Sequence, residues 1–320
     1  MDGFSVALSE ITLVLFTTLA PSGAVAYLLM SLPVLSGRAA GDTARRLNQL
    51  TCLPLLVAMV GLVASATHLG NPANALYVFT GVGRSPLSTE VFAAVIFLAL
   101  AGVYWLYSFA EHPRVGLQRG LLAAIDVAIV AFVSSVAFAY NVDTIVTWSL
   151  PLVPASLILN ALFGGPLLAL AGFALASRGL GAASTAELPI AYAAPEGASK
   201  AQPTAVRVFP SRRGARILLT LATAACAANV AVCAVLGFQL QGIENELVSA
   251  ADLVAGYPVY LAAFAVLAAS ALALAWCAAI KRELRQSPAP LVVASALAFV
   301  AIFLMRFTFY MSHLTVGLGV

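Results

Sequence analysis

Residues 257–280 read YPVYLAAFAVLAASALALAWCAAI, an apolar run that contains no charged side chain. A helix of roughly 20 such residues spans the hydrocarbon core of a lipid bilayer. Lipid offers no hydrogen-bond partner to exposed backbone amides, and the run lacks the alternation of polar and apolar residues that a membrane β-strand shows. The run therefore predicts a transmembrane helix.

Seven further runs of the same kind fill most of the remaining chain. Hydrophobic residues make up 62% of the 320 residues and charged residues 9%, with a mean hydropathy of +1.00, whereas a soluble domain carries about 25% charged residues. The predicted fold class is all-α: a polytopic membrane helix bundle of eight transmembrane helices, forming one integral membrane domain over residues 1–320. The predicted spans are 11–35, 49–67, 91–110, 121–140, 151–176, 217–240, 257–280 and 289–311.

The distribution of basic residues predicts the orientation of the bundle. Of the 16 Lys and Arg residues, all but Arg84 and Arg306 lie in one set of loops. Cytoplasmic loops carry an excess of Lys and Arg, so this set is predicted to be cytoplasmic and both termini to lie outside. The chain starts MDGF, with no basic residue before the first span, which argues against a cleaved signal peptide. The net charge of +3 then reflects topology and not nucleic-acid binding.

Residues 177–213 form the one long polar stretch, rich in Ala, Gly, Ser and Pro. Such a composition is typical of a flexible linker. Its basic residues place it on the cytoplasmic side, so we predict a cytoplasmic linker that separates five spans from three.

Cysteine and histidine positions offer little for a metal centre. The cysteines all lie inside predicted spans and form no CxxC pair. A bis-histidine haem needs two ligands at similar depth on facing helices, and His68 with His313 is the one pair that offers this. We therefore expect no metal and no iron–sulfur cluster in this chain, with a haem at the outer edge as the weaker alternative. The cysteines are Cys52, Cys226, Cys233 and Cys277.

The outer loop HLGNPANALYVFTGVGRSPLST, residues 68–89, is predicted to be ordered and functional. Turn signals at 70–72 and 81–83 flank an apolar patch, which is more structure than a simple connection needs. The first turn is expected to fix His68 beside that patch. The candidate ligand-binding residues of the loop are Gly70, Asn71, Pro72, Tyr77 and Arg84.

His68 ends the second span and Glu90 begins the third, at the same depth on consecutive antiparallel helices. In a purely structural interpretation, the helix dipole stabilises a histidine at a helix C-terminus and a carboxylate in a first turn. In a functional interpretation, a base and an acid at the lipid interface accept the two protons of a quinol. Arg84 is then a natural counter-ion for Glu90 or a donor to a quinone carbonyl.

Arg306, Tyr310 and His313 are spaced by four and three residues, so they share one face of the last helix. An arginine inside a span is energetically costly and rarely faces lipid. A structural interpretation pairs Arg306 with Asp143 or Glu90. A functional interpretation adds the three side chains to the ligand site.

A secondary transporter is the rival hypothesis from another class, with Asp126 and Arg306 as substrate or proton sites. Transporters of this kind use discontinuous helices at mid-membrane depth, and the sequence shows no such pair. Asp126, with Asn160 and Asn229, is instead expected to stabilise helix packing.

Four stretches of the sequence resemble the DmsC family, the membrane-anchor subunits of DMSO reductase and related molybdopterin oxidoreductases. The likeness extends over most of the chain and includes the same eight-span plan, although the 177–213 loop is longer than is usual in the family. The stretches are ATHLGNP at 66–72 with GRSPLSTE at 83–90, AYNVDT at 139–144 with TW at 147–148, FGGPLL at 163–168, and RFTFY at 306–310 with HLTVG at 313–317.

The resemblance implies an anchor that oxidises menaquinol, an exchangeable substrate, in anaerobic respiration. Electrons would pass to a ferredoxin-like iron–sulfur subunit and then to a molybdopterin catalytic subunit, both docked on the outer face of the bacterial cytoplasmic membrane. His68 matches the quinol-linked histidine of the family, and Glu90 matches its neighbouring carboxylate. Whether the chain itself counts as an enzyme stays open, as does the substrate of the complex: DMSO, another N- or S-oxide, tetrathionate or selenate.

Overall fold

The structure, a computed structural model, describes residues 2–68, 72–186, 211–245, 247–280 and 287–315. Eight helical stretches in this part of the chain are long and apolar enough to cross a membrane, which confirms the predicted fold class. The second of these stretches consists of α3 and α4 in succession. The elements are α1 (Gly3–Ser9), α2 (Ile11–Leu35), α3 (Gly41–Leu50), α4 (Cys52–Thr67), the 3₁₀ helix η1 (Pro72–Gly81), α5 (Pro86–Tyr107), α6 (Val115–Ala139), α7 (Val153–Ala186), α8 (Arg212–Leu240), α9 (Ala250–Leu253), α10 (Tyr257–Ile280) and α11 (Ala289–Met311).

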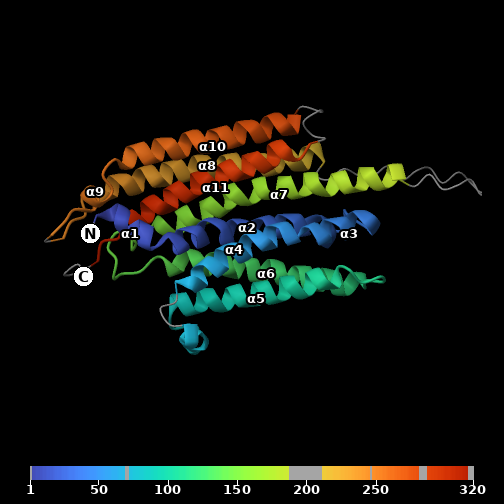
Figure 1. The fold of residues 1–320 in the computed structure, drawn as a ribbon, viewed down its shortest axis with the longest axis horizontal. Helices are drawn as coiled ribbons and strands as arrows, with labels where there is room; N and C mark the ends of the chain where they lie inside the picture. Colours follow the sequence, from blue (N-terminus) through green and yellow to red (C-terminus); the bar gives the residue numbers. More distant parts are fainter. Residues whose placement is uncertain (1, 69–71, 187–210, 246, 281–286, 316–320) are drawn as a thin grey trace, which may run out of the picture.

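The long helices run side by side along the bundle, with α2 and α7 packed against each other at its centre (Figure 1). On one side α8 and α11 pack against α7 while α10 packs on α8 and α11, and on the other α4 and α6 pack against α2 while α5 packs on α6. One buried apolar cluster is centred on α2 and extends to the terminal end of α11, and a second lies among α7, α8, α10 and α11.

The two ends of the bundle differ in what they carry. Figure 1 shows α1 and α9 at the same end as the last turn of α11; we call this the terminal end. The opposite end carries α3 and basic residues such as Arg38, Arg45 and Arg114, and we call it the basic end. An even number of crossings brings α1 and the end of α11 to the same end of the bundle, as predicted. That this end faces the outside of the membrane stays a prediction from the distribution of basic residues.

Several helices extend beyond the predicted spans. The second stretch begins at Gly41 and not at residue 49, and α6 begins at Val115 and not at 121, because polar residues continue these helices past the apolar core. The helix α5 begins at Pro86, where the Ser85 side chain accepts a hydrogen bond from the Ser88 amide, the usual way of starting a helix.

The predicted linker is shorter than 177–213. The helix α7 continues to Ala186, and α8 begins at Arg212 after the cap residue Ser211. The apolar run ends near residue 176, but Ala-rich sequence supports a helix beyond the membrane. Residues 187–210, the rest of the predicted linker, lie outside the described residues.

Glycines allow the central helices to approach closely, as is common in membrane bundles. A Cβ atom added at Gly23 of α2 would lie 2.7 Å from the Ala58 amide nitrogen of α4, and one at Gly61 of α4 would lie 2.9 Å from the Ala20 amide nitrogen of α2. Gly164 and Gly165, of the FGGPLL stretch, face Ser22 and Val25 of α2 in the same way.

Gly23→Ala is expected to destabilise the bundle, because the new methyl group meets backbone atoms that cannot rotate away. Overpacking of this kind costs about 1–3 kcal/mol. The measurement is the thermal unfolding of the detergent-solubilised protein, with Gly102→Ala as the matched control, since a Cβ atom at Gly102 meets nothing within 4 Å. Equal unfolding temperatures for the two variants would contradict the close α2–α4 contact.

Candidate functional site

His68 lies at the terminal end, where it caps the C-terminus of α4. Its Nε2 atom is 3.4 Å from the Oε2 atom of Glu10, the residue between α1 and α2. The sequence pattern does not single out Glu10, because the break between α1 and α2 that places it there lies within one apolar run. The first predicted partner of His68, Glu90, forms no ion pair with it in the described part of the chain.

His313 belongs to the same group of titratable side chains. Its ring packs edge-on against Trp148, with ring centroids 5.1 Å apart. Burial lowers the pKa of the His313 imidazole below its usual value, and the Glu10 carboxylate acts in the opposite direction. Glu10 therefore interacts with both histidines, and we call His68, Glu10 and His313 the terminal triad.

Arg306 lies deeper in the bundle and is only 1% exposed. Its Nε atom donates a hydrogen bond to Thr17 Oγ1 of α2 at 3.0 Å, and its guanidinium carbon lies 4.1 Å from the centre of the Phe309 ring. The Nη2 atom has no hydrogen-bond partner among the described residues. Neither Asp143, which is exposed, nor Glu90 forms an ion pair with it, so the structural pairings considered for Arg306 are absent from the described structure.

Tyrosine side chains surround the arginine. The guanidinium carbon is 5.6 Å from the centre of the Tyr140 ring and 5.5 Å from that of Tyr310, and the two rings lie 6.0 Å apart. The Tyr310 hydroxyl is fully buried beside Arg306, Tyr140 and Thr17, but it forms no hydrogen bond of good geometry with any described residue. Such groups are costly to leave unpaired in a protein interior, which marks the position as one where a ligand can supply the missing partner.

Glu90 lies in the first turns of α5 and is 2% exposed. Its Oε2 atom has no hydrogen-bond partner in the described structure. The carboxylate lies within electrostatic range of both Tyr140 and Tyr310. No ion pair or hydrogen bond joins Glu90 to Arg306 in the described structure, but both residues lie near the same two tyrosines, and we call Glu90, Arg306, Tyr140 and Tyr310 with Thr17 the buried cluster.

Backbone contacts hold the two groups together. The amide of Val146, in the α6–α7 loop, donates a hydrogen bond to the Leu314 carbonyl at 2.9 Å, and the Trp148 ring stacks on Phe309 at 4.8 Å. The described parts of two stretches that carry the family likeness, 139–148 and 306–315, are thus neighbours in space. This contact places the terminal triad and the buried cluster at the same end of the bundle.

The other predicted residues of the outer loop lie elsewhere. Gly70 and Asn71 fall outside the described residues, and Pro72 is the first residue of η1. Tyr77 is 70% exposed on η1, and Arg84 lines a shallow groove of about 200 Å³ between the start of α5 and the end of α6. No ion pair joins Arg84 to Glu90 in the described structure.

Asp126 lies in a separate polar group nearer the basic end. Its carboxylate accepts a hydrogen bond from Ser31 of α2 at 2.8 Å. Fully buried Phe16, Phe97 and Phe132 pack between this group and the buried cluster, with the last two rings stacked at 5.9 Å. Asp126 and Arg306 therefore do not form one site, which argues against the transporter hypothesis.

Asn160 of α7 and Asn229 of α8 form a hydrogen bond with each other. Asn229 Nδ2 donates to Asn160 Oδ1 at 2.7 Å, in the buried interior. This is the helix-stabilising role predicted for them, although Asp126 is not part of the pair.

The fold and the site define a class: a polytopic helical membrane protein in which buried Glu90 and Arg306, each with an unpartnered polar atom among the described residues, lie at the same end of the bundle as His68 and Glu10. The family described as DMSO reductase anchor subunit (DmsC) matches residues 4–311, and the chain belongs to that family. It is therefore a multi-pass protein of the bacterial inner membrane and the anchor of a DMSO reductase-type complex, which implies a catalytic subunit and other subunits as partners.

Three curated relatives agree with this assignment. The protein is 29% identical over 317 residues to the C subunit of the anaerobic dimethyl sulfoxide reductase of Escherichia coli strain K12, and the match covers 97% of both sequences. It is 27% identical to the anaerobic dimethyl sulfoxide reductase subunit YnfH of the same strain, again over 97% of both. It is 32% identical to the corresponding C subunit of Haemophilus influenzae over 49% of this protein and 56% of the relative.

Proposed function

We propose that the chain oxidises menaquinol at its terminal end, which faces the outside, and passes the electrons to an iron–sulfur subunit docked there. That subunit feeds a molybdopterin catalytic subunit. The observation that carries the proposal is the buried cluster itself. Glu90 and Arg306 are both almost fully buried and both have unpartnered polar atoms among the described residues; Arg306 lies against Tyr140 and Tyr310, and Glu90 is within electrostatic range of both.

Quinol oxidation breaks two O–H bonds, sends two electrons to the partner subunit and releases two protons. A site for it needs proton acceptors in contact with the lipid-soluble substrate and a way out for the protons. Glu90 is the acceptor inside the bundle. The terminal triad of His68, Glu10 and His313, at the same end, takes the protons to the outer solution.

Arg306 has a different role in this proposal. A guanidinium is always charged and donates hydrogen bonds from several nitrogens. Its unpartnered Nη2 atom is suited to bind a quinol or quinone oxygen, because a charge-assisted hydrogen bond is stronger than a neutral one. The Tyr310 hydroxyl supplies a second hydrogen-bonding group beside the Arg306 guanidinium.

Purification of the complex in mild detergent tests the proposal as a whole. We expect an iron–sulfur protein and a molybdenum protein to co-purify with the chain, and the complex to oxidise a menaquinol analogue. A chain that purifies alone with a b-type haem spectrum would support the haem alternative instead.

Glu10→Gln is expected to shift the pH dependence of quinol oxidation. Glu10 raises the pKa of the His313 imidazole against the effect of burial, so removal of its charge lowers that pKa further. The neutral, proton-accepting form of His313 then persists to lower pH, and the acidic limb of the pH–rate profile moves to lower pH. An Asp252→Asn variant, at an exposed position of α9, is the control. An unmoved acidic limb would show that Glu10 does not act on the proton-accepting step.

A further inference from the structure

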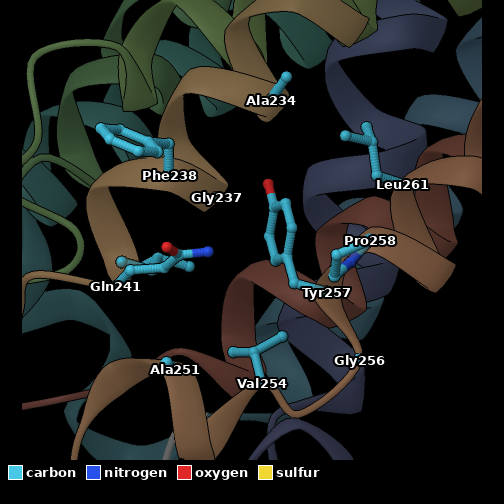
Figure 2. A pocket seen from close by; sticks show the side chains of 11 residues that line it. Ala234, Gly237, Phe238, Gln241, Ala251, Val254, Gly256, Tyr257, Pro258 and Leu261 are labelled. Atoms are coloured by element: carbon cyan, nitrogen blue, oxygen red, sulfur yellow. The ribbon is translucent and has the colours of Figure 1, made fainter.

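A groove of about 380 Å³ opens between α8 and α10 near the terminal end, where α9 closes one side. Figure 2 shows the Tyr257 ring standing in the middle of this α8–α10 groove, with Ala234 and Leu261 beyond its hydroxyl and Gln241 on the opposite wall. Most of the lining is apolar, and none of the lining residues, all of them described, is charged. Its volume lies within the usual range of small-molecule pockets, about 300–1,000 Å³.

The Tyr257 ring is held in place by two contacts. A Cβ atom at Gly237 of α8 would lie 2.3 Å from Tyr257 Cε1, so only glycine leaves room for the ring there. The Tyr257 hydroxyl donates a hydrogen bond to the Cys233 carbonyl at 2.7 Å. The ring thus forms the inner wall of the groove.

A small polar cavity lies behind that wall. Tyr257 and Leu240 line both the groove and this cavity, which has a volume of about 30 Å³, enough for one or two water molecules. Arg306 lines the cavity, and its Nη2 atom has no partner among the described residues. The other polar side chains that line it are Thr147, Ser156, Asn160, Thr308 and Ser312.

We propose that the α8–α10 groove is a second binding position for the quinol, separated by the Tyr257 ring from the cavity that Arg306 lines. This inference rests on the proposed function, and no bond is made or broken in the groove. A quinol is a neutral molecule with an apolar ring and tail, which suits walls without charge. A phospholipid head group carries a phosphate and would need a cationic partner, which the lining does not offer.

The position of the groove supports the same occupant. Phe238, which lines the groove, and Val259, the residue after the lining residue Pro258 on α10, are apolar and exposed on the surface of the membrane-spanning helices, so a membrane-soluble molecule reaches the groove without crossing water. Tyr257 offers a ring for stacking, and Gln241 offers a neutral amide to a quinol hydroxyl. Leu240 and Tyr257 line both the groove and the Arg306 cavity, so a molecule bound in the groove lies next to the proposed quinol site.

The test uses the complete complex in a bilayer of known lipids and a photoreactive quinone with an isoprenoid tail. We expect label on peptides of α8 and α10 in the natural protein. Ala234→Trp fills the groove and is expected to remove this label and to raise KM for quinol about 10-fold with little change in kcat. Val235→Trp, an exposed neighbour that does not line the groove, is the matched control and is expected to change neither.

Each outcome decides one question. Label confined to α4 and α5, or a phospholipid found in the groove by native mass spectrometry, would overturn the second position. Label mapping in the natural protein gives this answer even if Ala234→Trp fails to assemble. Label in the groove together with normal quinol oxidation by a His68 variant would instead overturn the proton role of His68 and leave the groove intact.

Discussion

Replacing His68 by glutamine should abolish quinol-dependent reduction by the complex while leaving the complex assembled. Glutamine keeps a polar side chain beside Glu10, which lies 3.4 Å from the histidine, but it cannot take up a proton. General acid–base groups contribute about 10²–10⁴-fold to a rate, so a loss of at least 100-fold in quinol oxidation is expected. The measurement is the rate of electron transfer from a menaquinol analogue to the terminal acceptor.

An artificial donor that reduces the partner subunits directly separates this effect from misfolding. We expect His68→Gln to keep the full rate with that donor, because the substitution leaves the redox centres of the proposed partner subunits untouched. A structural histidine would lower assembly and both activities together. Normal quinol oxidation by the variant would move the proton-accepting step to the face of α11 that carries Arg306, Tyr310 and His313.

Arg306→Met is expected to be the most informative substitution in the buried cluster. Replacing buried ionic groups by apolar residues of similar volume is often neutral or stabilising by about 1–4 kcal/mol. Arg306 has no ion-pair partner in the described structure, so methionine should not weaken the fold. Quinol oxidation, in contrast, should fall at least 100-fold, since loss of a preorganised charged donor costs about that much. Thermal unfolding in detergent and the quinol rate measure the two effects.

Thr17→Val provides the matched control for the Arg306 variant. It removes the hydrogen-bond acceptor of Arg306 Nε, at 3.0 Å, without removing the charge. A buried donor left unsatisfied costs about 1–3 kcal/mol, so this variant should lose stability and keep most of its activity. The opposite pattern, an unstable Arg306→Met and an inactive Thr17→Val, would show that the arginine is a structural element.

The membrane helices could be predicted because each depends on the local composition of one run. The predicted spans 11–35, 257–280 and 289–311 have the same first and last residues as α2, α10 and α11. Where polar residues continue a helix beyond the apolar core, as in α3 and in the last turns of α7, hydropathy alone predicts too short a helix.

The site could be predicted only in part, because it depends on which helices pack closely. Consecutive helices suggested that His68 and Glu90 form one pair. In the structure α4 instead packs closely on α2 through Gly23 and Gly61, so His68 meets Glu10. Glu90 is buried in the bundle near Tyr140, the residue that caps the end of α6. No local sequence pattern predicts that these two residues lie close together.

The layer formed by Phe16, Phe97 and Phe132 has a consequence for energy conservation. These rings are fully buried and carry no group that can bind a proton or a water molecule. In a respiring membrane, each proton that leaks back dissipates about 2.3 kcal/mol per 100 mV of potential. Asp126 and other polar side chains lie nearer the opposite end of the bundle. If water molecules connected them to the proton-accepting groups at the terminal end, protons would leak across the membrane. Under the proposed function, these apolar rings separate proton release at the terminal end from Asp126, so that quinol oxidation there would not lower the potential across the membrane.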